Sequence, residues 1–188
     1  MIEVLVAPQS DLVTVDEARA DVGAGDDATL AAVIKRASAA AETFIGRPVL
    51  AGTYRETVWL PRPVADVWLS RWPVGAVSGI TLDGQDVTGT GWRLNGGALV
   101  RWSDGRPGLW GAGDLAVTYT AGHATCPEDI KAAVLTLVRD MYFAIGRDAA
   151  IKSDTYCDGT SVTMAVNLPS ISRAVTDLLM PYRGVVVG

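Results

Sequence analysis

The sequence predicts an α+β fold: a small bundle of about four helices that carries an inserted antiparallel β-sandwich or partial barrel. Stretches 26–45 and 125–145 repeat apolar residues every three or four positions, which puts those residues on one face of a helix. The segment between them is rich in Gly, Pro, Val, Thr and Trp and breaks into short apolar runs separated by turn signals. The prediction is a single domain, 1–188, with its helical bundle at 12–48 and 125–183 and its β-insertion at 50–122.

Composition and charge exclude several classes of protein. The 188 residues are 49% hydrophobic and carry a net charge of −5, with no cluster of Lys or Arg. This argues against a dedicated nucleic-acid-binding site, although DNA could slide along a mildly acidic surface without binding to it. Cys126 and Cys157 lack the spacing of a disulfide framework or zinc site. The N-terminus has no basic region, and no apolar run approaches a membrane span, so we expect a soluble protein of a reducing cytoplasm.

The chain opens with two local signals. Residues 1–10 alternate apolar side chains up to Pro8, which indicates either a strand or a tail that docks elsewhere. Thr14 and Glu17 then have capping-box spacing, and we expect a short helix from there through Val22.

The second helix is predicted to begin at Asp26-Asp27, where acidic side chains meet the positive end of the helix dipole. It ends at Gly46, and Pro48 prevents its continuation. Small residues such as Ala39 on its back face would permit close approach of another helix, but alanine is also the best helix former. The predicted core face is Leu30, Val33, Ile34, Ala37, Ala41, Phe44 and Ile45.

The central segment contains several short strand patterns, and the best hairpin signal is Asn95-Gly96 between two apolar runs. All six tryptophans lie between Trp59 and Trp110. Some must fill the core, but tryptophan is also enriched at the anchors of protein interfaces, so both roles stay open. The predicted strands are Tyr54–Leu60, Val67–Leu69, Val77–Leu82, Trp92–Leu94, Ala98–Trp102 and Leu115–Thr120.

The longest helix is predicted from Thr125 to Ile145, with a capping box formed by Thr125 and Glu128 and with Pro127 in its first turn. Ala132 and Phe143 lie away from the core stripe. An outer aromatic is either local packing under a loop or a contact with another copy of the chain. The predicted core stripe is Ile130, Ala133, Val134, Leu137, Val138, Met141 and Ile145.

Residues 147–168 form a polar connection, for which a flexible arm is favoured over a short strand or hairpin. A last helix then places Ile171, Val175, Leu178 and Leu179 on one face and stops at Pro181. The tail, 184–188, holds three consecutive valines that could add a strand to a neighbouring sheet or pair within the chain's own β-insertion.

A search for chemistry finds no catalytic constellation. His123 is the single histidine, and its neighbours in sequence, Tyr119 and Cys126, do not complete a nucleophile–base pair or a metal site. No GxSxG elbow and no phosphate-binding loop are present. We predict no catalytic, cofactor-binding or metal-binding residues. A small enzyme or small-molecule-binding module with a site near His123 remains the competing class.

Several short motifs in a fixed order carry a resemblance over nearly the whole chain. The sequence resembles the head–tail connector (adaptor, or head-completion) proteins of tailed bacteriophages and phage-like gene transfer agents. The matching stretches are Thr14-Val-Asp-Glu-Ala18, Phe44-Ile-Gly-Arg-Pro48, Leu60-Pro-Arg-Pro-Val64, Val117-Thr-Tyr-Thr-Ala-Gly-His123, Pro127-Glu-Asp-Ile-Lys-Ala-Ala133 and Leu179-Met-Pro-Tyr-Arg183.

The resemblance implies a structural protein of virion assembly, with no catalytic residues and no cofactor. The resemblance further implies a ring, usually of twelve copies, beneath the portal. The ring extends the DNA channel and offers a platform to a tail stopper or terminator-type protein, and DNA passes without sequence-specific binding. The implied location is the head–tail junction of a virion or phage-like particle assembled in the bacterial cytoplasm, with no membrane. A tail or capsid decoration protein is a further alternative.

On this basis we assign two surfaces. The last helix and the tail are expected to meet the portal protein, and outer helical and tryptophan positions are expected to meet other subunits. The expected portal interface is Leu178, Leu179, Tyr182, Arg183, Val185, Val186 and Val187. The expected subunit interface is Ala39, Ala132, Phe143, Trp102 and Trp110.

Overall fold

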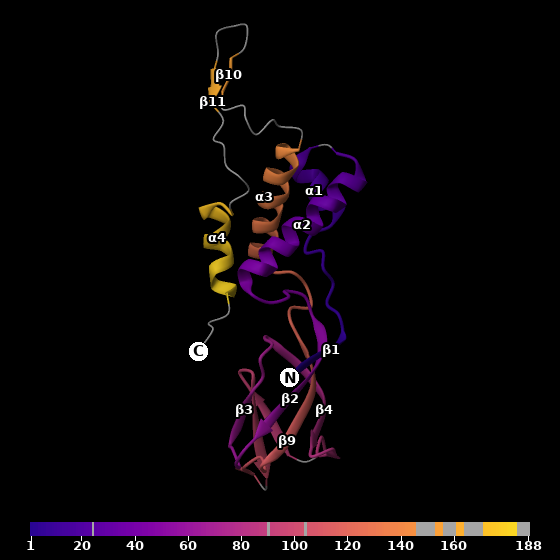
Figure 1. Ribbon diagram of the computed structural model, residues 1–188, viewed down its shortest axis with the longest axis vertical. Helices are drawn as coiled ribbons and strands as arrows, with labels where there is room; N and C mark the ends of the chain where they lie inside the picture. The colour runs from indigo at the N-terminus through magenta and orange to yellow at the C-terminus, as the bar shows by residue number, and fades with distance from the viewer. Residues whose placement is uncertain are drawn as a thin grey trace. The chain divides into compact units, whose positions relative to one another are not determined.

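The computed structural model describes residues 1–23, 25–89, 91–103, 105–145, 153–155, 161–163 and 171–183 (Figure 1). The chain divides into two compact units. The β-unit consists of Met1–Gln9 and Arg47–Cys126, and the helical unit of Ser10–Gly46 and Pro127–Gly188. Within the described residues there are four α-helices and, in the β-unit, antiparallel sheets of five and four strands, so the predicted α+β class is confirmed.

The larger sheet of the β-unit has the strand order β1-β2-β9-β4-β5, and neighbouring strands are antiparallel. The N-terminal segment is therefore a strand of this sheet, β1, paired with β2. The β-unit extends beyond the predicted insertion because this strand comes from the far N-terminus. The bounds are β1 Ile2–Val6, β2 Gly52–Leu60, β4 Val74–Leu82, β5 Gln85–Asp86 and β9 Gly113–Ala121.

The smaller sheet has the order β3-β7-β6, and β8 also pairs with β7. Its β6–β7 hairpin turns at Gly96 and Gly97, whose φ angles of 56° and 98° lie in the left-handed region that glycine adopts without strain. This confirms the hairpin predicted from Asn95-Gly96. The bounds are β3 Asp66–Trp68, β6 Trp92–Asn95, β7 Ala98–Ser103 and β8 Arg106–Pro107.

The two sheets share one hydrophobic core. Along β9 every second residue is buried, as expected for a strand with one face against a core. Side chains from both sheets meet in a single cluster, so the β-unit is packed as a sandwich. The buried members include Tyr54, Leu60, Val67, Ile80, Leu99, Trp110, Leu115, Val117 and Tyr119.

The helical unit is built around α3, which packs against α1, α2 and α4. Most residues of the predicted core stripes of α2 and α3 are buried. The exceptions are Phe44 and Met141, which are half-buried, and Ile145, which is exposed. Ser38 is also buried, and its hydroxyl accepts a hydrogen bond from Leu12 N at 3.1 Å. The bounds are α1 Val15–Val22, α2 Asp27–Ile45, α3 Glu128–Ala144, α4 Arg173–Leu179 and the short 3-10 helix η1 Met180–Tyr182.

The start of α3 differs from the prediction. The helix begins at Glu128, its N-cap position is Pro127, and no side chain caps it. The capping box expected from Thr125 and Glu128 is therefore wrong. Proline fits at this boundary because the helix does not need its missing N–H.

Residues predicted as a flexible arm include two short strands. β10 Ser153–Thr155 and β11 Ser161–Thr163 pair antiparallel, with Asp154 opposite Val162. The hairpin alternative, rather than the loop, therefore describes these residues. Threonine in both strands and valine in β11 favour the extended backbone.

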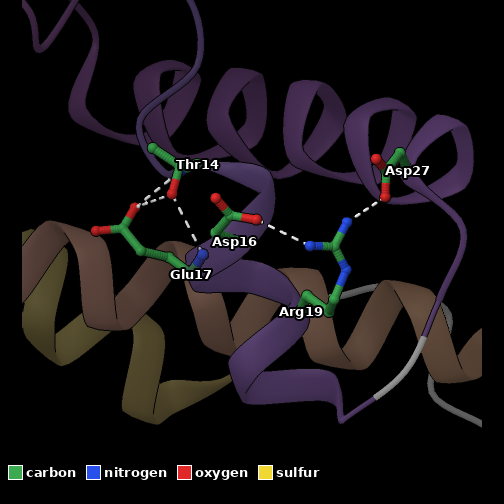
Figure 2. A network of polar contacts seen from close by, with 5 residues as sticks. All are labelled: Thr14, Asp16, Glu17, Arg19 and Asp27. Atoms are coloured by element: carbon green, nitrogen blue, oxygen red, sulfur yellow. Dashed lines mark hydrogen bonds and ion pairs between the residues drawn. The ribbon is translucent and has the colours of Figure 1, made fainter.

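The beginning of α1 carries the capping box that the sequence predicts (Figure 2). Thr14 N donates to Glu17 Oε2 at 2.7 Å, and Glu17 N donates to Thr14 Oγ1 at 3.2 Å. Arg19 joins Asp16 at 2.8 Å and also contacts Asp27 at the start of α2. The same Glu17 carboxylate receives a hydrogen bond from Lys131 of α3 at 3.0 Å. Polar contacts thus join α1 to both neighbouring helices.

Acid should weaken the helical unit through Glu17. The Thr14 N–H, and then Lys131, lower the pKa of the Glu17 carboxyl from 4.5 to about 2. The stabilisation is therefore complete above pH 4.5 and is lost as the pH falls toward 2, because the unfolded chain binds the proton first. Glu17→Gln should remove this component, at most about 1 kcal/mol because the site is partly exposed and screened. Denaturant unfolding between pH 7 and pH 3 measures it. Glu128→Gln, an exposed neighbour of the same lysine, is the control.

Candidate interaction surfaces

The residues considered for chemistry have structural roles. Tyr119 is fully buried, and its hydroxyl donates to Glu56 Oε2 at 2.7 Å. Burial and then this hydrogen bond raise the pKa of the Tyr119 hydroxyl, so it stays protonated at neutral pH. Glu56 is itself buried on β2 and accepts two more hydrogen bonds, from Ser70 N at 3.0 Å and Ser70 Oγ at 2.5 Å. The network fixes the segment that follows β3.

His123 lies where β9 leads toward α3. Its backbone N donates to Val49 O at 2.8 Å, and its carbonyl accepts from Ala51 N at 2.9 Å. Burial, followed by the charge of Arg47, lowers the pKa of His123 below its usual value. The Cys126 side chain is buried and is not part of a disulfide. In the part of the chain that the structure describes, no group of three or more His, Cys, Asp or Glu side chains could hold a metal ion.

Trp110 was assigned to a subunit contact, and the structure places it in the core instead. Its side chain is 1% exposed, and its Nε1 donates to Leu99 O at 3.0 Å. A side chain this buried has no surface to offer a neighbour. Trp102 is half-buried on β7, with the Arg93 guanidinium 3.9 Å above its ring, so it can still take part in a contact.

The exposed aromatic surface of the β-unit comes from residues that were not assigned individually. Trp59, Trp68 and Trp72 are 64%, 67% and 40% exposed, and Leu109 is also exposed. Trp68 lies between Val67 and Leu69, both buried, so the two-residue period of a strand could have identified it as outward-facing. Arg47 holds Trp72: its guanidinium is 3.5 Å from the ring centre and donates to Trp72 O at 2.6 Å. Large exposed aromatics of this kind mark interaction surfaces.

The helical unit exposes the three positions assigned to subunit contacts. Ala39 on α2 and Ala132 on α3 are exposed. Phe143 is 46% exposed and packs edge-on against Tyr142, with ring centres 5.7 Å apart. A half-exposed ring supported by a second ring is a rigid apolar surface.

The expected portal surface at the C-terminal end is partly internal. Leu179 is fully buried within the helical unit, so it anchors α4 and cannot form an outer contact there. Leu178 and Tyr182 are half-buried and Arg183 is exposed. The Tyr182 hydroxyl donates to Asp129 Oδ2 at 3.3 Å, and the Arg183 guanidinium lies 5.5 Å from the Phe44 ring centre. Val185, Val186 and Val187 lie outside the described residues.

Across the described residues, no helix is long and apolar enough to cross a membrane. The candidate site thus consists of interaction surfaces on two units, and the Tyr119 side chain and the His123 backbone form hydrogen bonds within the β-unit.

Comparison with solved structures finds the same fold along the whole chain. A chain from the neck of an empty gene transfer agent (GTA) particle computed with C6 symmetry matches with a TM-score of 0.63 and 21% identity, covering 100% of this chain and 97% of that one. A chain from a native GTA virion gives the same values. A chain from the neck of a native GTA particle computed with C12 symmetry matches at 0.62 and 22%, with the same coverage. At this identity the likeness shows a shared fold.

Comparison with curated proteins finds no match. A family model described as Head completion protein matches residues 13–185, which is most of the chain. The chain therefore belongs to the Head completion protein family and has a structural, non-enzymatic role.

Proposed function

We propose that the protein is a head–tail adaptor: it forms a ring beneath the portal protein, extends the DNA channel, and gives the next tail component a surface on which to dock. The observation that carries this proposal is the fold match over the full chain to chains of particle necks, two of them computed with sixfold and twelvefold symmetry. Family membership supports the same location, the head–tail junction of a virion or phage-like particle.

A ring of one kind of subunit needs two different contact surfaces on each copy, because its contacts run head to tail. The chain offers such surfaces. The helical unit exposes Phe143, Ala39 and Ala132, and the β-unit exposes Trp59 and Trp68. We assign the helical positions to contacts between subunits and the exposed tryptophans to a neighbour or a tail protein.

The portal contact is assigned to the C-terminal end. Leu178 on α4 and Tyr182 on η1 are half-buried, and Arg183, directly after η1, is exposed. The three valines follow them in sequence. Leu179 and Phe44 hold this end of the chain in place. Acidic residues outnumber basic ones, 21 to 16, which suits a wall along which DNA slides.

Light scattering of the protein alone and mixed with the portal ring tests the proposal. We expect a monomer in dilute solution and about one copy bound per portal subunit. Removing residues 184–188 should abolish portal binding and leave the thermal unfolding midpoint unchanged. A variant of full length with the three valines replaced by serine separates the loss of apolar contact from the loss of chain length.

Two outcomes would contradict the proposal at different levels. If the truncated chain still binds the portal, the tail is not the portal contact. If the intact chain ignores the portal and a small molecule raises its unfolding midpoint, the protein is instead a binding module.

A further inference from the structure

The outer edge of β1 is open and apolar. In the part of the chain that the structure describes, β1 pairs on one side only, with β2. Four of its five side chains are apolar and exposed: Ile2 at 36%, Val4 at 55%, Leu5 at 47% and Val6 at 60%. Natural sheets protect such edges with charges, prolines, bulges or very short strands, because an open edge pairs with other chains. β1 carries a single charge, Glu3, and no proline, and its ladder with β2 shifts register once, between Val4 and Val6.

The opposite edge of the same sheet is protected. Its last strand, β5, has only two residues. The ladder between β4 and β9 is interrupted by two register shifts, between Val74 and Val77 and between Val77 and Gly79. The backbone N–H of Ile80 on β4 already donates a hydrogen bond to the Thr88 hydroxyl, at 2.8 Å. The β5 side is therefore the better protected of the two edges, chiefly because its last strand is so short.

The register identifies the backbone groups that face the open edge. Met1 and Thr57 exchange both backbone hydrogen bonds, at 2.7 and 2.8 Å. Bonded and non-bonded pairs alternate along an antiparallel ladder, so Glu3 bonds to β2, whereas the N–H and C=O groups of Ile2 and Val4 point away from it. A strand laid against β1 would meet these groups.

A second element of the chain needs such a partner. β10 and β11 form a two-stranded sheet that has no third strand among the described residues. A two-stranded hairpin is at best marginally stable in water, and a third strand or a packed face is needed to hold it. Its composition suits pairing with another strand, since five of its six residues are Ser, Thr or Val, and threonine and valine favour strands.

We propose that the β10–β11 hairpin of one copy adds to the β1 edge of a neighbouring copy, which extends the five-stranded sheet across the subunit boundary. The contact is head to tail, because hairpin and edge are different surfaces, and repetition of it closes a ring. The inference rests on the proposed ring and names the backbone contact that joins its subunits.

Val4→Pro tests the edge without breaking the sheet. Proline removes an N–H that points away from β2 and is tolerated at edge positions whose N–H faces outward. Val4→Thr, which keeps the N–H and the preference for a strand, is the matched control. We expect Val4→Pro to keep the wild-type unfolding midpoint. Its apparent affinity for assembly on the portal ring should fall at least about tenfold. One ladder hydrogen bond contributes about 1.4 kcal/mol or less, and this bond is lost at every subunit contact of the ring. Val4→Thr should assemble like the wild type.

A mixing experiment tests both halves of the contact without the portal. Replacing residues 153–163 with a Gly/Ser segment of equal length removes the hairpin and leaves β1 intact. At high concentration, the Val4→Pro and hairpin-replaced chains should each stay monomeric, and together they should form one-to-one dimers and nothing larger. Dimers of the hairpin-replaced chain alone would overturn the proposal, because they would require β1 to pair with β1.

Hydrogen exchange gives a readout at single residues. The amides of Ile2 and Val4 should exchange fast in the monomer and slowly in the assembly, and the Glu3 amide should be slow in both. Slow exchange of Ile2 and Val4 in the monomer would overturn the proposal. Wild-type assembly of the Val4→Pro chain on the portal would also overturn the proposed strand pairing. The adaptor function would remain supported in that case, because the chain would still bind the portal. If the wild-type chain does not bind the portal, the adaptor function fails, and the mixing experiment still decides the contact.

Discussion

Replacing Trp110 with alanine lowers the free energy of unfolding of the β-unit by about 3–5 kcal/mol. The indole is 1% exposed, so its removal leaves a cavity that the surrounding sheets cannot fill. The change also leaves Leu99 O without the hydrogen bond from Nε1. The backbone of Trp110 pairs with Val64 in both directions, at 2.8 and 3.1 Å, so the damaged position is also a junction of two segments.

Trp68→Ala is the matched control, because it removes the same side chain from a position that is 67% exposed. Its effect on unfolding should stay within about 0.5 kcal/mol. Urea unfolding followed by circular dichroism measures both variants without relying on tryptophan fluorescence. Similar losses for the two variants would contradict the division of the tryptophans into core and surface. Under the proposed function, Trp68→Ala should weaken assembly while it spares the fold.

The helices were predictable because their signals are local. The Thr14–Glu17 capping box, the Asp26 N-cap and the glycine ends of α1 and α2 all lie within a few residues of the structure they determine. The start of α3 was not predicted correctly, since Thr125 and Glu128 match the capping pattern but Pro127 takes the N-cap position. A spacing rule cannot distinguish these cases when two signals overlap.

The sheets were predictable as strands but not as a pairing. Six strand patterns and the Asn95-Gly96 turn were read directly, whereas the pairing of β1 with β2 joins residues about fifty positions apart, and nothing local specifies it. Trp68 and Trp110 are both tryptophans in the same segment. Their opposite roles follow from strand phase and sheet packing, and the latter depends on the whole β-unit.

The interaction surfaces, too, were predictable where the signal is local and not where it depends on packing between elements. Ala39, Ala132 and Phe143 were assigned to outer faces of long helices, where the helical period is reliable, and all three are exposed. Leu178 and Leu179 are adjacent on a short helix, and which of them turns inward depends on the helices that α4 packs against. Leu179 is the buried one, so sequence alone could not separate the anchor from the surface residue.

The second large effect is expected at Glu56, whose role was not predicted. Its side chain lies on the inner face of β2 between Tyr54 and Val58, and the two-residue period places it there. A buried carboxylate needs hydrogen-bond donors. Its three donors, Ser70 N, Ser70 Oγ and Tyr119 OH, come from segments distant in sequence. The alternation could have marked Glu56 as unusual, but only the fold identifies its partners.

Glu56→Ala should lower the free energy of unfolding of the β-unit by about 2–3 kcal/mol, because it leaves the buried Tyr119 hydroxyl without its acceptor and removes the acceptor of Ser70 N. Tyr119→Phe removes one donor and leaves the Ser70 contacts, so its cost should be about 1–2 kcal/mol. Glu3→Ala, a glutamate from the exposed edge strand, is the control and should stay within about 0.5 kcal/mol.

Burial, and then the hydrogen bond to Glu56, also make the contribution of Tyr119 to stability depend on pH. Since the pKa of Tyr119 is raised in the folded state, the folded protein binds the hydroxyl proton more tightly than the unfolded chain does. Stability from this group is therefore complete below the usual tyrosine value of 10.0 and falls as the pH rises above it. Tyr119→Phe should lack that component of the alkaline loss. Because Ser70 lies between Trp68 and Trp72, Glu56→Ala should also speed exchange of the Ser70 amide and loosen the aromatic surface. Unchanged exchange at Ser70 would show that the network does not hold that surface.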